Sequence, residues 1–295
     1  MQDKIIKVLA NNGRILITLA LTTQIAEKSR QTHDLSPLAT AAMGRLLTVG
    51  IMMSADLKNA KDKLTLQVKG GGPIGVMIVT ANSNSEIKGY VGNSLVDLPL
   101  NEFGKLDVGG AVGTIGFLNV IKDIGLKEPY VGISNLVSGE IGDDFANYFV
   151  NSEQKRSAVA VGVLVNKDGV KSSGGYLINA MPDATSEEIS KLEKNIYEAG
   201  AISKMLDSGM TLIEIAKKIT GDENVRVIKD DVTPKYLCDC SKENMEKGLI
   251  SLGKDELKDI LKTDKKVNIK CHFCNKEYNF SEADLIEILA EINKI

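Results

Sequence analysis

Apolar and polar positions alternate with a period of two through much of residues 61–180. The clearest case is KLTLQVK at 63–69, where every second residue is apolar, as in a strand with one buried face. Further short apolar runs follow, separated by Gly, Asn and Asp: VMIVTAN, IKGYVGN, GTIGFLNVI, PYVGISNLV, SAVAVGVLV and GGYLINAM. Many short strands with frequent turns predict a largely antiparallel, sheet-rich domain that also contains helices.

The first 60 residues combine a strand-like run with a long apolar helix. The run extends from Arg14 to Leu21. Ser36 is a good N-cap residue and Pro37 is tolerated at the first helical position, so a helix is predicted to begin here. Its sequence, LATAAMGRLLTVGIMMSADL, is apolar or small over most of its surface, which predicts a buried helix.

Beyond Pro182 the pattern becomes helical. Thr185 and Thr211 are each followed three residues later by Glu, which is the spacing of a capping box. We therefore expect two helices, at 186–199 and 212–219, and then a polar connector, GDENVRVIKDDVTPK.

These changes in pattern divide the chain into three parts, and the predicted fold class is α+β. Residues 1–182 form a sheet-rich N-terminal core domain with packed helices, residues 183–232 form a helical linker, and residues 233–295 form a small C-terminal module. A chain of 295 residues can bury a large core without disulfides or metal.

Composition narrows the possible partners. The net charge of −3 argues against a general polyanion binder, so no nucleic-acid partner is expected. The apolar segment ILITLAL at 15–21 lacks a following cleavage site, and no run approaches the roughly 20 apolar residues of a membrane helix. We expect a cytoplasmic protein without a membrane partner, in a compartment where clustered cysteines more often hold metal or do redox work than form permanent disulfides.

All four cysteines lie in the last sixty residues. Cys238 and Cys240 form C-x-C, and Cys271 and Cys274 form C-x-x-C. A C-x-x-C turn brings two sulfurs to one metal, and residues i and i+2 of an extended segment point to the same side. Four thiolates bind zinc tetrahedrally, so the sequence predicts one Zn²⁺ per chain held by these four residues.

The rest of the module is helical and small. A short helix is predicted at 251–262, and Ser281 opens a final amphipathic helix that runs to Ile295. About sixty residues with few aromatics are marginal alone, and a bound metal can supply the missing folding free energy.

Three roles are open for such a metal. Structural zinc is the commonest use of four cysteines. A nucleic-acid zinc ribbon is disfavoured, because residues 233–295 carry 11 Lys against 12 Asp and Glu, a net charge of −1. A redox switch is the third role, since zinc-bound cysteines are thiolates, the form that oxidants attack. Closing Cys271–Cys274 and Cys238–Cys240 would remove all four ligands, with the strained C-x-C bridge the harder to form.

The cysteine spacing and its surroundings resemble a known family. CHFCNKEYNF, from Cys271 to Phe280, fits the pattern C-x-F-C-x-x-x-Y-x-F. Together with GGGPIGVMIVTANSNSEIKGYVGN and HDLSPLATAAMGRLL, it resembles the redox-regulated thirty-three-kilodalton heat shock protein family of bacterial holdase chaperones. One departure is Lys88-Gly89-Tyr90, where the family typically has Arg-Gly-Tyr, and it keeps the positive charge.

The resemblance implies an ATP-independent chaperone and not an enzyme. The reduced, zinc-bound form would be inactive. Hypochlorite, or peroxide with unfolding stress, would oxidise Cys271 and Cys274 first and then Cys238 and Cys240. Zinc release would unfold the module, loosen the linker and expose a surface for unfolded client proteins, and the activated form would be a homodimer. The competing hypothesis is an unrelated globular protein, such as an enzyme, with a purely structural zinc.

Other motifs favour structural roles. GGGPIG at 70–75 lacks the Gly-Lys-Ser/Thr ending of a phosphate loop, and the glycines at 110, 113 and 116 lack the spacing of a dinucleotide fingerprint. The pair His33-Asp34 is more typical of surface structure than of catalysis. His272, between the C-x-x-C cysteines, is an alternative metal ligand, but four thiolates already complete a tetrahedron.

Overall fold

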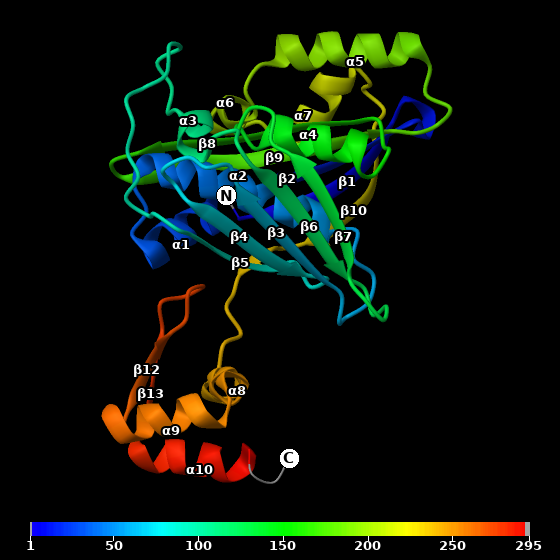
Figure 1. Ribbon diagram of the computed structural model, residues 1–295. Helices are drawn as coiled ribbons and strands as arrows, with labels where there is room; N and C mark the ends of the chain where they lie inside the picture. The colour runs from blue at the N-terminus through cyan, green and yellow to red at the C-terminus, as the bar shows by residue number, and fades with distance from the viewer. Residues whose placement is uncertain (1, 293–295) are drawn as a thin grey trace. The chain divides into compact units, whose positions relative to one another are not determined.

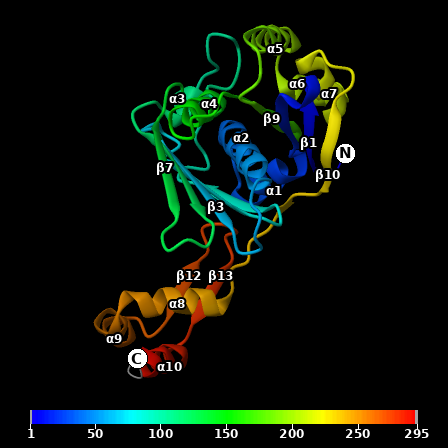
Figure 2. The ribbon, with the colours of Figure 1, turned by 90° about the vertical axis from the view of Figure 1, so that its right-hand side faces the viewer.

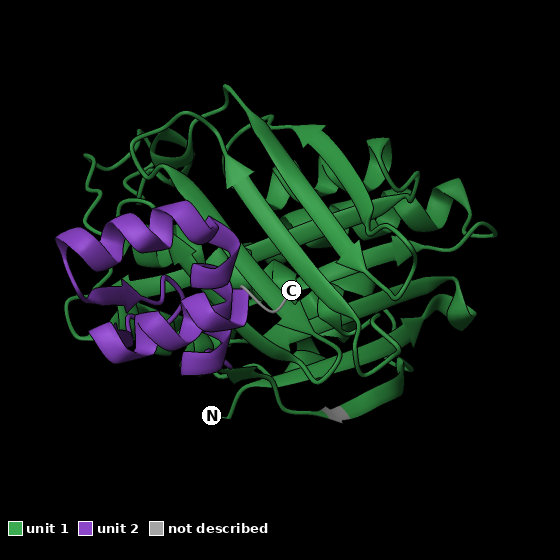
Figure 3. Ribbon diagram, turned by 60° about the horizontal axis from the view of Figure 1, so that its bottom comes forward, with its two compact units in different colours: residues 1–237 green, residues 238–295 purple. Residues whose placement is uncertain are grey.

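The computed structural model describes residues 2–292 and divides into two compact units. Unit 1 is residues 1–237 and unit 2 is residues 238–295 (Figure 3). Each unit has its own hydrophobic core, and each is described by itself below.

Unit 1 contains two β-sheets, a five-stranded sheet A and a six-stranded sheet B (Figure 1). Sheet A is antiparallel and has the order β10-β1-β2-β9-β8. Its strands are β1 (Lys4–Ala10), β2 (Ile15–Leu21), β8 (Ser157–Asn166), β9 (Gly169–Ala180) and β10 (Arg226–Val232). The short 3-10 turn η1 (Asn11–Gly13) joins β1 to β2, whose register pairs Ala10 with Ile15.

Sheet B has the order β11-β5-β4-β3-β6-β7 and is antiparallel except where β11 joins β5. Its strands are β3 (Lys63–Lys69), β4 (Val76–Asn82), β5 (Glu86–Val91), β6 (Phe117–Asp123), β7 (Tyr130–Asn135) and β11 (Lys235–Tyr236). In β3 the buried residues alternate with exposed or half-buried ones, as the sequence pattern predicts. The predicted sheet-rich, mixed fold is confirmed.

Helix α2 (Pro37–Ser54) is the centre of unit 1. It contacts strands of both sheets and lies between them (Figure 2). The Ser36 hydroxyl accepts a hydrogen bond from the Ala39 N–H at 3.1 Å, which confirms the predicted N-cap. Although α2 is long and apolar enough to cross a membrane, 89% of it is buried inside the protein, as expected of a core helix.

The other helices of residues 1–182 pack against α2 or against strands of the two sheets. They are α1 (Thr23–His33), α3 (Val108–Val112) and α4 (Gly142–Asn151). An ion pair between Arg45 and Glu140 connects α2 to the segment before α4, and Glu140 also accepts the Gly109 N–H. These contacts fix α3 and α4 relative to the buried helix.

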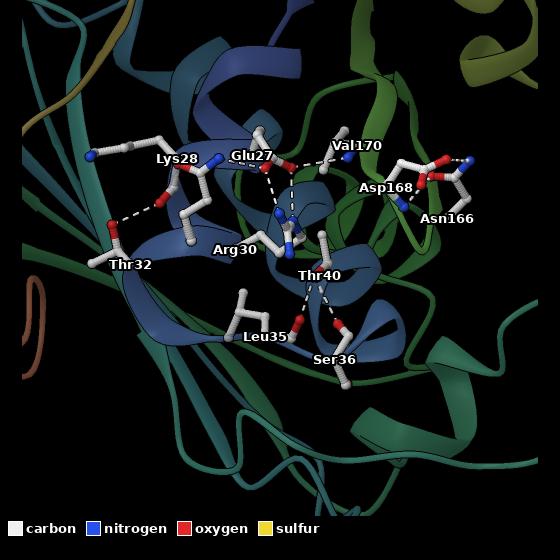
Figure 4. A network of polar contacts seen from close by, with 11 residues as sticks. Glu27, Lys28, Arg30, Thr32, Leu35, Ser36, Thr40, Asn166, Asp168 and Val170 are labelled. Atoms are coloured by element: carbon white, nitrogen blue, oxygen red, sulfur yellow. Dashed lines mark hydrogen bonds and ion pairs between the residues drawn. The ribbon is translucent and has the colours of Figure 1, made fainter.

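Figure 4 shows how α1 is connected to the start of β9. Arg30 donates two hydrogen bonds to the Glu27 carboxylate, at 2.9 and 2.6 Å. The same carboxylate accepts the Val170 N–H at 3.0 Å. Because these hydrogen bonds favour the ionised form, above all those from Arg30, the pKa of Glu27 is lowered to about 2.

Three helices lie between β9 and β10 in the chain: α5 (Ser186–Ala199), α6 (Ile202–Asp207) and α7 (Leu212–Thr220). α6 and α7 pack on sheet A, and α5 packs on α7. Both predicted capping boxes are present, at Thr185 and Thr211. Both predicted helices are present, as α5 and α7, but the short helix α6 between them was not predicted. The chain turns at Gly200, where φ is +76°, and α6 begins after it. The prediction of a polar connector after α7 is wrong, because residues 226–232 form β10 and pair with β1.

Unit 2 consists of a hairpin and three helices within residues 238–292. They are α8 (Lys242–Leu252), α9 (Lys254–Thr263), β12 (Val267–Lys270), β13 (Glu277–Phe280) and α10 (Glu282–Ile292). α9 and α10 were predicted, although the last three residues of the predicted final helix lie outside the described residues. α8 and the hairpin were not predicted. The unit has a small core of buried residues: Leu249, Leu257, Cys271, Tyr278, Phe280, Leu285 and Ile288.

Candidate metal centre

Two segments of unit 2 carry the cysteines. Cys238 and Cys240 lie in irregular chain between β11 and α8, and Cys271 and Cys274 lie in the turn that joins β12 to β13. The turn is closed by two hydrogen bonds, from Cys271 N–H to the Lys276 carbonyl at 2.9 Å and from Asn275 N–H to the Cys271 carbonyl at 2.8 Å. Asn275 has a φ of +60°, a conformation that asparagine tolerates better than most residues.

The fold brings all four sulfurs together. The Sγ atoms lie within 4.8 Å of one another, and all four thiols are free. The Sγ of Cys238 is 3.8 Å from that of Cys271, and the Sγ of Cys240 is 3.3 Å from that of Cys274. Each of these contacts joins one cysteine of C-x-C to one of C-x-x-C, so the cluster connects the segment before α8 to the hairpin.

This donor set fits a tetrahedral metal ion. Four sulfurs at about 2.3 Å from a central Zn²⁺ would be about 3.8 Å apart, close to the separations in the cluster. Cys271 is buried and the other three cysteines are half-buried, so the sulfurs face one another in a largely closed site. A closed site with four soft ligands is typical of structural zinc rather than of catalytic zinc, which keeps one position open.

Tyr278 extends the cluster on one side. Its hydroxyl donates to the Cys240 carbonyl at 2.9 Å and to the Cys240 Sγ at 3.1 Å. This hydrogen bond to Cys240 raises the pKa of Tyr278. Burial alone would raise the pKa of Cys240, but the hydrogen bonds from Tyr278 and the neighbouring thiols outweigh burial and lower it to about 7.

The other cysteines with a resolved shift behave differently. Burial raises the pKa of Cys238 and that of Cys274. Among these three, Cys240 is therefore the thiol that ionises most readily. Lys276 lies 5.1 Å from the centre of the Tyr278 ring, and Lys242 lies 5.2 Å from that of Phe280, so positive charge lies over both rings of the small core.

Each residue weighed in the sequence has a place in the structure. The four predicted cysteines are adjacent, and His272 is not part of the group of described residues whose donor atoms lie within 4.8 Å. Their assignment as zinc ligands and disulfide partners stays a prediction. The involvement of Tyr278 was missed, because a tyrosine four residues after Cys274 fits core packing equally well.

The competing motifs have structural roles. Residues 70–75 are the connection between β3 and β4, and a Cβ on Gly70 would lie 2.3 Å from the Gly113 carbonyl oxygen, so the glycines allow two loops to approach closely. The His33 Nε2 lies 3.1 Å from the Tyr236 hydroxyl, and Asp34 is the left-handed C-cap of α1. His33 and Asp34 are thus placed as structural residues at a helix end.

Comparisons with known proteins agree over the whole chain. A family model described as Hsp33 protein matches residues 3–281. The 33 kDa chaperonin of Lachnoclostridium phytofermentans is 45% identical over 99% of this chain and 100% of its own length, and that of a Thermoanaerobacter species is 46% identical over 98% of each. The crystal structure of the 33 kDa chaperonin from Thermotoga maritima, 36% identical, superposes with a TM-score of 0.90 over 100% of both chains.

Proposed function

The chain belongs to the Hsp33 family of non-enzymatic chaperones, and on that premise we propose that it is a redox-regulated, ATP-independent holdase whose four cysteines are the switch. The observation that carries the proposal is the group of four free cysteines, with sulfurs within 4.8 Å, in the small core of unit 2. Membership in the family excludes the competing hypothesis of an unrelated enzyme.

In the reduced, inactive protein, Cys238, Cys240, Cys271 and Cys274 hold one Zn²⁺. The metal supplies two things when bound: it keeps the sulfurs as thiolates, and it adds folding free energy to a unit too small to be stable without help. Support comes from the sulfur separations and from the burial of Cys271 among the apolar residues of unit 2.

Oxidation then converts the ligands into disulfides. The thiolates of Cys271 and Cys274 together lose two electrons and form one S–S bond. With two protons taken from solvent, hydrogen peroxide is reduced to two waters, or hypochlorite to chloride and one water. Cys238 and Cys240 follow in the same way, as their segment loosens. Because all four sulfurs are within 4.8 Å, proximity allows this pairing, and the order rests on the strain of a C-x-C bridge.

Once oxidised, the cysteines can no longer act as metal ligands. The part of unit 2 that packs against them includes Tyr278 and Phe280, which are buried in the same core. We expect unit 2 to unfold as a consequence, because few apolar residues remain to stabilise it.

The client-binding surface then comes from residues 183–232, which we propose act as a linker between the N-terminal core domain (1–182) and the zinc module (233–295). α6 and α7 bury an apolar face against the outer face of sheet A, through residues such as Leu206, Ile215 and Ile219. The linker ends in β10, an edge strand. Loosening of this layer would expose the apolar helices and the strands below them, and unfolded proteins would bind there.

The remaining parts of the proposal concern partners and location. We propose that the activated protein is a homodimer, that it acts in the cytoplasm, and that its partners are aggregation-prone clients rather than nucleic acids or membranes. The acidic balance of the whole chain, with a net charge of −3, supports the exclusion of nucleic acids.

Light scattering of a thermally unfolding enzyme, such as malate dehydrogenase, tests the proposal. Reduced, zinc-loaded protein is compared with protein treated with hydrogen peroxide under mild heat. We expect only the oxidised sample to suppress aggregation, with release of one zinc and faster proteolysis within 183–232. Suppression by the reduced protein alone, or by neither sample, would contradict the switch, and a linker that stays protected in the active state would contradict its proposed role.

A further inference from the structure

Unit 1 contains a cavity of 960 Å³ that the chaperone switch does not use. It lies where α2 leaves the space between the sheets. Sheet A contributes Leu177 to its lining, sheet B contributes Leu64, and α4 contributes Phe149. Its volume is at the upper end of the range of about 300–1,000 Å³ that is usual for small-molecule sites.

The inner part of the cavity is apolar. Met53, Leu64, Phe149 and Leu177 line it and are themselves at most 5% exposed, so they form a fixed floor. At the mouth, Met181 is 38% exposed and remains partly open to solvent. Burial of an alkyl chain against these four side chains is favourable, whereas the same side chains offer no hydrogen bond to a polar chain.

The rim carries an excess of positive charge. Four cations line the cavity, Lys58, Lys122, Lys155 and Arg156, together with three carboxylates, Asp56, Asp62 and Glu153. Each carboxylate already has donors within unit 1. Asp56 pairs with Lys7, which does not line the cavity, and Asp62 accepts the backbone N–H groups of residues 58 and 59.

Glu153 is the remaining carboxylate, and its side chain is 7% exposed. It binds both Lys122 and Lys155 and accepts the Tyr148 hydroxyl. Burial works to raise the pKa of Glu153, but the hydrogen bonds from the two lysines outweigh it and lower that pKa, so the carboxylate stays charged. One negative charge thus faces two positive ones, while Lys58 and Arg156 have no carboxylate partner among residues 2–292.

We infer that the cavity binds one amphiphilic anion, a medium-chain fatty carboxylate, with its alkyl chain on the apolar floor and its head group at Lys58 and Arg156. Apolar burial supplies the affinity, and the two cations fix which end lies at the mouth. A cationic amphiphile of the same length would meet the same floor but a repulsive rim. The site is separate from the cysteines, so reduced, zinc-loaded protein is the correct sample and the outcome does not depend on the redox switch.

Isothermal titration calorimetry of the full chain with decanoate tests the inference. We expect saturable binding of one decanoate, tighter than that of octanoate by about fifteenfold, since each buried methylene contributes about fourfold in affinity. Decyltrimethylammonium should bind at least tenfold more weakly than decanoate. Equal binding of the anion and the cation, or non-saturable binding of many molecules, would overturn the inference.

Variants at the rim separate the head-group contacts from general adsorption. Lys58→Ala and Arg156→Ala should each weaken decanoate binding about tenfold, whereas Lys61→Ala and Lys167→Ala remove equal charge from exposed positions outside the cavity and should leave it unchanged. Met181→Glu adds a negative charge at the mouth and should abolish binding. Its control, Leu164→Glu, adds the same charge at a position 37% exposed that does not line the cavity.

The position of the bound decanoate is measured independently, by methyl NMR of protein labelled at methionine. The Met53 and Met181 methyl signals should shift in proportion to occupancy, and that of Met245, in unit 2, should not. Shifts confined to Met245, or decanoate affinity that none of the rim variants changes, would show that the carboxylate binds elsewhere and would overturn the assignment.

Discussion

The two units of this protein are stabilised in different ways. Unit 1 encloses α2 between two sheets and buries a large apolar cluster around it, with a second cluster beneath α6 and α7. Unit 2 has a small cluster in which Cys271 is itself a core residue and the other cysteines are packed against it. Unit 1 contains no cysteine, whereas the core of unit 2 contains the thiols that an oxidant would convert into disulfides.

This difference supports the proposed switch, in which unit 1 stays folded while unit 2 unfolds after oxidation. A domain of about 60 residues buries only about 60% of its unfolded surface and often needs a metal or disulfides for stability. Unit 1 is roughly four times longer than unit 2 and has no such need. Each of the following experiments changes one unit, and the other unit serves as the internal reference.

Metal removal should have the largest effect. Chelation with EDTA under reducing conditions should unfold unit 2, because structural zinc contributes on the order of 10 kcal/mol to folding of small zinc domains. Hydrogen exchange should show lost protection in α8, α9 and α10 and retained protection in α2.

Cys274→Ser should reproduce much of this effect without a chelator, and Ser251→Ala, an exposed change in the same unit, serves as its control. Unchanged exchange in unit 2 after complete metal removal would show that its core is stable alone and would remove the proposed basis of the switch.

A core substitution in unit 1 should have the next largest effect. Leu46 on α2 is 0% exposed, so Leu46→Ala should lower the free energy of unfolding of unit 1 by about 2–5 kcal/mol. Urea denaturation followed by circular dichroism measures the loss, and Leu164→Ala, at a position 37% exposed, is the control. Bound zinc should stay at one per chain below the transition. Loss of zinc in parallel with unit 1 would mean that the two cores are not independent.

The contrast between the units also determines what could be predicted from the sequence. β3 and α2 were predictable because their patterns are local: strict alternation in the first, and a Ser36 cap with an apolar surface in the second. The four cysteines were predictable because their spacing restricts how they can meet. β10 was not, because RVIKDDV is rich in charge and pairs with β1, more than 200 residues earlier in the chain.

Other features depended on contacts that no local pattern encodes. The break at Gly200 interrupts an otherwise continuous helical pattern, and only the packing of α6 against β8 and β9 shows why the chain turns there. The strands of the hairpin β12–β13 have only four residues each, which is short for an alternating pattern to identify, and its turn is closed by backbone hydrogen bonds around Cys271. The hydrogen bond from Tyr278 to Cys240 joins residues 38 positions apart, so no local pattern encodes it.

A smaller effect is expected at that tyrosine. Tyr278→Phe removes the hydrogen bonds to the Cys240 carbonyl and Sγ, while it keeps the ring in the core. Groups that hydrogen-bond to metal ligands typically contribute 10- to 100-fold to affinity, so zinc should be bound about tenfold more weakly. Competition with a chromophoric chelator measures this, with Tyr197→Phe, 89% exposed on α5, as the control. Equal affinities for the variant and the parent would show that Tyr278 only packs.

The smallest expected effect is on the stability of unit 1. Its measurement tests whether pH changes the stability of one unit without changing that of the other. The Arg30 hydrogen bonds lower the pKa of Glu27 to about 2, well below its ordinary value of 4.5. A carboxylate with a lowered pKa in the folded state stabilises the protein above its unfolded pKa, and this stabilisation is lost as pH falls from about 4.5 toward 2. Because the pair is partly solvent-exposed, we expect its contribution to be about 1 kcal/mol or less.

Glu27→Gln should therefore unfold more easily than the parent at pH 7, by up to about 1 kcal/mol, and the two proteins should converge near pH 2. The measurement is the difference between their urea midpoints from pH 7 to pH 2, read from signals of unit 1, with Glu193→Gln on the exposed side of α5 as the control. A difference that stays constant with pH would mean that Glu27 contributes by packing rather than by charge. A difference that appears in unit 2 would contradict the independence of the two cores, since the hydrogen bonds of Glu27 described above join α1 to the start of β9, both within unit 1.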